Sequence, residues 1–125
     1  MLAQDSYVFP ADLYRLGGSA DPHLARVRPV RDVTVLERNG VSWVVANNRG
    51  ISLYTEAGVR RAGLTGWAWR IRRGTALPTG LKLHHDAHDH YLLCPVADMG
   101  LAEYRGLLER LVVRCERVMK IVEAK

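Results

Sequence analysis

The stretch LKLHHDAHDHYLLCP, residues 81–95, holds four of the five histidines in the chain, together with two aspartates. Imidazole and carboxylate groups at this density suit three kinds of chemistry: metal binding, proton transfer, and the holding of a phosphate or a ribose hydroxyl. Leu81 and Leu83 alternate with Lys82 and His84, DAHD has the composition of a turn, and HYLLCPV is apolar. The sequence therefore predicts a hairpin whose turn is flanked by the histidines.

The four histidines have different expected surroundings. His88 would stand at the tip of the turn as a solvated side chain, whereas His85 and His90 would lie at the inner ends of the two strands and face a cleft floor. Zinc needs three or four ligands, and His84 or His85 with His88 and His90 could supply them. No second cluster of Cys or His completes a closed site, so we predict no metal.

A second polar feature lies in the alternating segment ISLYT. Its apolar face carries Ile51 and Leu53, and its other face carries Ser52 and Tyr54, which marks a candidate functional surface. Motifs for nucleophilic catalysis or phosphate binding are missing: there is no G-x-S-x-G, no P-loop and no G-x-G-x-x-G. Cys94 precedes a proline in an apolar strand and does not suit a nucleophile.

Charge is distributed unevenly along the chain. The net charge is +5, yet residues 26–82 carry 11 basic and 3 acidic side chains, and ten of the basic ones are arginines. The guanidinium group of arginine forms bidentate hydrogen bonds with phosphate and carboxylate groups. A nucleic acid, a nucleotide pyrophosphate or an acidic protein would fit this segment, and a solvated basic face is the simpler alternative.

Several elements can be placed around these groups. DLYRL is a short extended or helical piece, VTVLE and VSWVVA flank an Asn-Gly turn and form a hairpin, and EAGVRRAGL is one helical turn or a loop. GWAWRIRRG reads as a strand with Trp67, Trp69 and Ile71 on one side, and we expect the tryptophans to belong to the core. Arg70 and Arg72 lie opposite them.

The C-terminal part changes its period. From Leu101 to the end, apolar residues follow a three-four spacing that predicts one amphipathic helix: Tyr104, Leu108, Leu111, Cys115, Val118 and Val122. We therefore expect one α+β domain over residues 1–125, with five or six short strands in a mostly antiparallel arrangement. No apolar run is long enough to span a membrane, and two isolated cysteines favour a cytoplasmic protein.

The order of four segments adds a resemblance. LYR, RNG, RGISLYTEAGVRRAG and GTALPTGLKLHHDAHDHYLLCPVADM follow one another before the basic helix. This order resembles the ADP-ribosyltransferase-like bacterial toxins typified by the type VI secretion effector Tse-two, over about residues 12–118. The resemblance implies a small split antiparallel β-sheet core with a C-terminal amphipathic helix, and NAD as cosubstrate in a cleft between the sheet halves.

The resemblance also implies roles for single residues. Arg15 would contact the NAD phosphates or the nicotinamide side, and a further arginine of the pattern matches either Arg28 or Arg31 equally well. Ser52 and Tyr54 would line the nicotinamide pocket.

The His-Tyr pair of the pattern corresponds to His90 and Tyr91, and its Lys-x-x-x-Asp region to Lys82 and Asp86, while His85 faces the same cleft. Cleavage of the nicotinamide bond passes through a cationic ribose, which Ser52 and His90 would steady as the catalytic groups. No glutamate stands where an arginine-modifying transferase places its catalytic acid, so transfer and NAD hydrolysis both stay open.

Three functions follow as expectations. The first is a cytoplasm-acting toxin that uses NAD, modifies an unknown macromolecular target and is neutralised by a cognate immunity protein or antitoxin. The second is a small basic RNA-cleaving toxin of a toxin-antitoxin pair, in which His and Arg act on RNA. The third is a non-enzymatic binding module that pairs with a partner through the apolar seam of the C-terminal helix.

Overall fold

The computed structural model describes residues 4–122, which form an α+β fold of ten strands and two helices. The strands are β1 Gln4–Ser6, β2 Leu13–Gly17, β3 Val35–Arg38, β4 Val41–Val44, β5 Ile51–Tyr54, β6 Gly66–Ile71, β7 Leu81–Ala87, β8 His90–Pro95, β9 Met99–Gly100 and β10 Glu116–Ile121. The helices are α1 Glu56–Arg61 and α2 Leu101–Val112. The predicted fold class is confirmed, but the predicted five or six strands were too few, because the shortest strands carry no periodic pattern.

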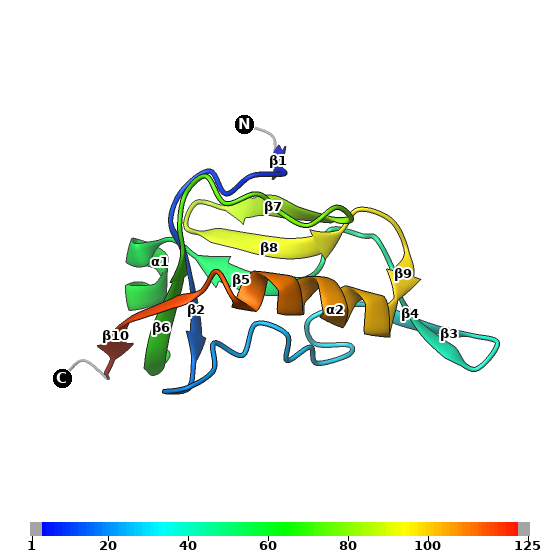
Figure 1. Ribbon diagram of the computed structural model, residues 1–125, viewed down its shortest axis with the longest axis horizontal. Coiled ribbons are helices and arrows are strands. Elements are labelled where there is room, and N and C mark those ends of the chain that lie inside the picture. Colours follow the sequence, from blue (N-terminus) through cyan, green and yellow to red (C-terminus); the bar gives the residue numbers. More distant parts are fainter. Residues whose placement is uncertain (1–3, 123–125) are drawn as a thin grey trace.

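The larger sheet is almost divided in two. Its strand order is β1-β7-β8-β5-β2-β6-β10, and its pairs are antiparallel. β5 pairs with β8 from Ile51 to Tyr54, whereas its register with β2 is the single pair of Tyr14 with Tyr54. In Figure 1, β7 and β8 run across the view and β2 and β6 run steeply down it. The strands therefore diverge where β5 meets β2.

Helix α2 covers the face of the sheet that carries Ile51 and Leu53. Both residues are fully buried, and Tyr104, Leu108 and Leu111 of the helix are buried against the same core. This stripe is the apolar seam expected from the three-four spacing. It is used for the core of the chain itself, which removes the basis for a binding module that pairs through this seam.

A tyrosine hydroxyl fastens α2 to the sheet. Tyr104 donates to the Leu93 carbonyl at 2.5 Å and accepts from the Ile51 amide at 3.3 Å. Gly50, next to Ile51, lies so close to β8 that a Cβ there would stand 1.8 Å from the Leu93 oxygen. Only glycine permits this approach of the two strands.

The smaller sheet has the order β3-β4-β9, and its hairpin is the one predicted from Asn-Gly. Asn39 and Gly40 have φ values of 52° and 77°, the positive pair that a tight turn of this kind requires. This hairpin projects from the side of the molecule opposite α1 (Figure 1).

Helix α2 has 12 residues, about half the length of the helix predicted from Leu101 to the end of the chain. It ends at Val112, and Glu116–Ile121 is instead strand β10, which pairs with β6. The last two members of the predicted stripe, Val118 and Val122, are 38% and 68% exposed, and the buried residue of β10 is Ile121, so the buried three-four spacing does not continue past Cys115. Residues 116–121 form a strand rather than a helix because their backbone pairs with the edge of β6.

The tryptophans of β6 are also placed differently. Ala68 is fully buried, but Trp67 and Trp69 are only partly buried, so their assignment to the core was wrong. The Arg117 guanidinium covers the Trp67 ring at 4.4 Å, and Trp69 Nε1 donates to the Gly18 carbonyl at 2.9 Å. Small Ala68 permits close packing on its side, and the large rings lie near the surface under cations and backbone.

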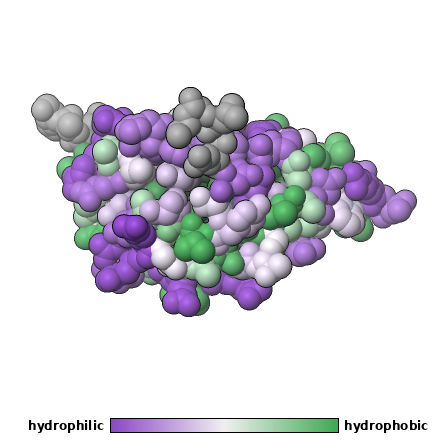
Figure 2. All heavy atoms as spheres, turned by 90° about the horizontal axis from the view of Figure 1, so that it is seen from above, coloured by the Kyte–Doolittle hydropathy of each residue, from purple (hydrophilic) through white to green (hydrophobic). Residues whose placement is uncertain are grey.

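Two features describe the surface. The face seen from above in Figure 2 carries hydrophilic and hydrophobic residues interspersed, with the hydrophobic ones in several small groups. In the part of the chain that the structure describes, no helix is both long and apolar enough to cross a membrane.

Candidate active site

A pocket opens where β5 and β2 diverge. Its volume is about 380 Å³, and four segments line it: Arg15 and Leu16 of β2, His23, Arg26 and Arg28 of the connection that follows, Ser52 and Tyr54 of β5, and Leu64. We call it the arginine pocket. A volume of this size suits a small molecule or part of a nucleotide.

Arg15 bridges the gap between the two strands. Its Nη1 donates to the Ser52 carbonyl at 3.1 Å, and its Nη2 lies 3.5 Å from the His23 carbonyl. Its Nε is buried without a hydrogen-bond partner among residues 4–122. Burial lowers the pKa of the Arg15 guanidinium from its ordinary value, because the charged form loses hydration.

A buried donor without a hydrogen-bond partner lowers the stability of the fold, and the described residues contain two such side-chain donors, the Nε atoms of Arg15 and Arg70. In this part of the chain Arg15 also has no counter-ion, whereas Arg70 has one. The Nε of Arg70 is also buried and unpaired, yet the Arg70 guanidinium reaches the Glu116 carboxylate at 3.4 Å. Within the described residues Arg15 forms no such ion pair. An anion in the pocket would satisfy both its charge and its free donor.

Arg28 lies at the same pocket but has its own counter-ion. Asp32 is 8% exposed, and its two oxygens accept from Arg28 Nη2 at 3.0 Å and from Arg28 Nε at 3.3 Å. The Arg28 amide donates to the same carboxylate at 2.7 Å, and this bond closes the turn. Arg31 is exposed and does not line the pocket, so the structure brings only the first of the two alternative arginines to the site.

Three residues of this region were missed by the sequence analysis: His23, Arg26 and the positioning carboxylate Asp32. His23 has a φ of 60°, a left-handed conformation, and its amide donates to Asp21 Oδ1 at 2.9 Å. The Asp-Pro-His sequence carries the signal of such a side-chain-capped turn. The sequence did not show that this turn would face the arginine pocket.

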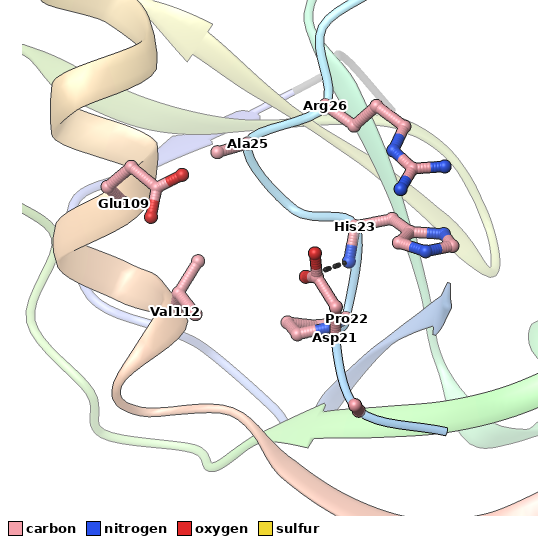
Figure 3. Close-up of a pocket in the computed structure, with 8 residues that line it drawn as sticks. Asp21, Pro22, His23, Ala25, Arg26, Glu109 and Val112 are labelled. Carbon is pink, nitrogen blue, oxygen red and sulfur yellow. Dashed lines mark hydrogen bonds between the residues drawn. The ribbon is translucent and has the colours of Figure 1, made fainter. Parts of the chain in front are cut away.

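The segment 20–26 has a second hollow on its other side, with a volume of about 480 Å³. Figure 3 shows Glu109 and Val112 of α2 facing this segment, while the side chains of His23 and Arg26 leave it on the side away from the helix. Asp21 and Glu109 make this hollow partly acidic. An anionic ligand is therefore better served by the arginine pocket.

His90 lies beside the pocket rather than in it. It faces Tyr54 across the β5–β8 pair, with ring centroids 5.1 Å apart, and its Nδ1 lies 2.7 Å from Asp86 Oδ1. Tyr54 thus separates the arginine pocket from a shallower hollow lined by His90.

The other histidines do not gather with His90. His85 stacks on Tyr91 at 4.3 Å on the buried face of the sheet, and burial raises the pKa of the Tyr91 phenol. His84 Nδ1 lies 2.9 Å from Asp5 Oδ1, and the His88 side chain is 94% exposed. The structure thus places His85 and Tyr91 outside the arginine pocket, and among the residues it describes no group of three or more His, Cys, Asp or Glu could hold a metal ion.

Both cysteines are free thiols. Burial raises the pKa of Cys94 and of Cys115 to about 12 in each case. Thiols of this pKa are protonated at neutral pH and make poor nucleophiles.

A split antiparallel sheet with Arg15, Ser52 and Tyr54 at the split is the arrangement expected of an ADP-ribosyltransferase-like toxin. The model of the Tse2 ADP-ribosyltransferase toxin family matches residues 7–118 of the 125-residue chain. The chain therefore belongs to the Tse2 ADP-ribosyltransferase toxin family. No curated protein sequence matches it significantly.

Proposed function

We propose that this toxin binds NAD in the arginine pocket and transfers its ADP-ribose to a macromolecular target or to water. The observation that carries the proposal is Arg15: a half-buried guanidinium with an unpaired Nε and no carboxylate within ion-pair distance among the described residues. Such a group is stabilised by an anion at its free donor.

The lining of the pocket fits NAD in charge. Arg15, Arg26 and Arg28 converge on it, and Asp32 neutralises Arg28 in part, so the lining keeps an excess of positive charge for a pyrophosphate. Tyr54 offers an aromatic wall, against which nicotinamide can stack. The polar and aromatic parts of the site thus match the two parts of the cosubstrate.

Bound NAD would supply an activated ADP-ribosyl group with nicotinamide as its leaving group. The residues of this chain would then do three things. Arg15 and Arg28 would hold the phosphates, Tyr54 would orient the ring that leaves, and Ser52, on the same strand, would contact the ribose. His85, Tyr91 and Arg31 do not line the pocket, so they would not contact the part of NAD that it holds.

We also propose that the toxin acts in the cytoplasm, where NAD is available, and that a cognate immunity protein or antitoxin neutralises it. Membership of a toxin family supports a neutralising partner, because a cell that makes an active toxin must restrain it. Delivery into a target cell as a type VI secretion effector is part of the same proposal.

The test is NAD turnover by the purified protein. The protein is incubated with NAD and cytoplasmic extract, and nicotinamide release and transfer of labelled ADP-ribose are followed. Arg15→Ala should lower the rate by at least about 10²-fold, the usual effect of removing one preorganised donor from a site of charge development. Arg105→Ala is the matched control, because Arg105 is exposed on α2 and does not line the pocket.

Two outcomes would contradict the proposal. If the wild-type protein releases no nicotinamide with any extract, NAD is not its cosubstrate. If it cleaves RNA in the absence of NAD, the RNA-cleaving alternative is correct, which the basic segment 26–82 originally suggested.

A further inference from the structure

The shallow hollow on the far side of Tyr54 lies between α1 and the β7–β8 turn. Its volume is about 320 Å³, and the residues that line it, among them Tyr54, Gly58, Arg61, Asp89 and His90, come from those elements and from β5. We call it the turn hollow. Because Tyr54 lines both this hollow and the arginine pocket, a group bound in one would lie next to a group bound in the other.

The walls of the turn hollow are fixed by a short network. Thr55 Oγ1 donates to Asp89 Oδ1 at 2.8 Å and accepts from the Gly58 amide at 3.1 Å, and Arg61 pairs with Asp89. A Cβ at Gly58 would meet the Asp89 carbonyl at 2.5 Å, so α1 can approach the turn this closely only with glycine there. The hollow is therefore preformed rather than a gap between mobile parts.

A β-bulge directs Asp86 toward His90. The β7–β8 register passes from His85 opposite Tyr91 to Ala87 opposite His90, which leaves Asp86 as the extra residue. Bulges next to active sites commonly re-aim a side chain in this way. Here the re-aimed carboxylate lies 2.7 Å from His90 Nδ1.

This contact defines the chemistry of the imidazole. An ionised carboxylate only accepts hydrogen bonds, so Nδ1 of His90 must carry the proton that it donates to Asp86. In the neutral ring, Nε2 then keeps its lone pair, and it has no hydrogen-bond partner among residues 4–122. His90 is thus set as a proton acceptor at the edge of the turn hollow.

We propose that the turn hollow binds the acceptor of ADP-ribose, that this acceptor presents a hydroxyl group, and that Asp86 positions His90 to take its proton. The proposal rests on the proposed use of NAD. A hydroxyl is the nucleophile that gains from a general base, since it is neutral and weakly acidic. A guanidine acceptor calls for a free carboxylate, and Asp89, which lines the turn hollow, is already paired with Arg61 and Thr55.

The transfer forms one bond and breaks another at the same carbon atom. The acceptor oxygen forms a bond to the anomeric carbon of the nicotinamide ribose, and the bond from that carbon to the nicotinamide nitrogen breaks. Its electron pair leaves with nicotinamide, whose positive charge is thereby neutralised. The hydroxyl proton moves to Nε2 of His90, whose charge the Asp86 carboxylate then compensates.

The first test uses imidazole nitrogen chemical shifts in the NAD-free protein. Wild-type His90 should show a protonated Nδ1 and an unprotonated Nε2, and Asp86→Asn should mix in the opposite tautomer, because an amide can donate as well as accept. A wild-type His90 with its proton on Nε2 would overturn the proposal without reference to any activity.

The second test uses methanol and agmatine as acceptors. In the presence of NAD, the wild-type protein should form methyl ADP-ribose and leave the guanidine of agmatine unmodified. His90→Gln and Asp86→Asn should each lower methanolysis on the order of 10²-fold, the usual contribution of a positioned base, with NAD affinity changed less than about threefold. Transfer to agmatine instead, or unchanged methanolysis in both variants, would refute the proposal.

The matched control is a second His-Asp pair in the same sheet. His84 Nδ1 lies 2.9 Å from Asp5 Oδ1, and neither residue lines the turn hollow. Asp5→Asn should therefore alter the tautomer of His84 and leave methanolysis intact. If the wild-type protein releases no nicotinamide at all, the proposed function fails, while the tautomer experiment still decides the role of Asp86.

Discussion

Strand β5 has two unlike neighbours. On the β8 side, which we call the closed side, it pairs from Ile51 to Tyr54, and Gly50 and Tyr104 bring strand and helix into direct contact. On the β2 side, which we call the open side, it shares one register pair and borders the arginine pocket. Apolar burial and backbone bonds hold the closed side, and the Arg15 bridge spans the open one. The contacts that stabilise the sheet and the pocket proposed to bind NAD thus lie at opposite edges of one strand.

The largest expected effect concerns the closed side. Leu53 is fully buried in the main core, so Leu53→Ala should lower the free energy of unfolding by about 2–5 kcal/mol. Chemical denaturation followed by circular dichroism would measure it. If the native fraction of this variant binds NAD with much weaker affinity, the two sides are coupled and the comparison fails.

The next effect concerns the open side. Tyr54→Ala should weaken NAD binding by about 1–3 kcal/mol, the range found for loss of a stacking ring, while Tyr54→Phe should retain most of the affinity. Isothermal titration with NAD distinguishes the two variants. Equal losses in both would mean that the hydroxyl matters, and would count against Tyr54 as an aromatic wall.

A subtler change on the closed side is Tyr104→Phe. It removes a hydroxyl that bonds to the Leu93 carbonyl and the Ile51 amide, and it leaves both groups buried without that partner. We expect a loss of about 1–3 kcal/mol in unfolding free energy, with NAD affinity unchanged. Unfolding curves of the two proteins measured at one pH provide the check.

The smallest effect is a chemical one. Burial raises the pKa of both cysteine thiols to about 12, so the folded protein should react slowly with iodoacetamide at pH 8, and the rate should increase about tenfold per pH unit. In the unfolded chain the thiols ionise near their ordinary pKa of 9.0, so their contribution to stability is present below pH 9 and is lost between about pH 9 and 12.

The variants Cys94→Ala and Cys115→Ala separate the two sites, because each leaves one thiol to label. Cys94 is fully buried on β8 and reports on opening of the closed side, while Cys115 lies between α2 and β10. Rapid labelling of Cys94 at pH 8 in the folded protein would show that the closed side opens readily.

Period and turn chemistry made much of the fold predictable. The Asn39-Gly40 hairpin, the alternation in β5 and the buried stripe of α2 each follow from local residue types. The end of α2 did not, because Val118 and Val122 continue the helical spacing in the sequence although both are exposed, and pairing with β6, a distant strand, forms β10 instead. Tertiary pairing overrode an ambiguous local signal.

The candidate site was predicted in part. Arg15, Ser52 and Tyr54 do meet at one pocket, and the structure selects Arg28 over Arg31 by position. His23, Arg26 and Asp32 were missed, since they come from an irregular connection whose path no periodicity describes. The sequence DAHD also did not show on which face of the sheet each histidine side chain lies. The bulge in β7 reverses the alternation of side chains for the residues that follow it.

The single pair that joins β2 to β5 also bears on folding kinetics. The Arg15 bridge closes over 37 positions of chain, the Arg70–Glu116 pair over 46 and the Asp5–His84 pair over 79. Loop-closure entropy opposes such distant pairings until several of them form together, and chains dominated by them fold slowly, on the order of milliseconds to seconds. The arginine pocket lies at one of these late junctions, so a newly made chain acquires this pocket only as the whole sheet closes.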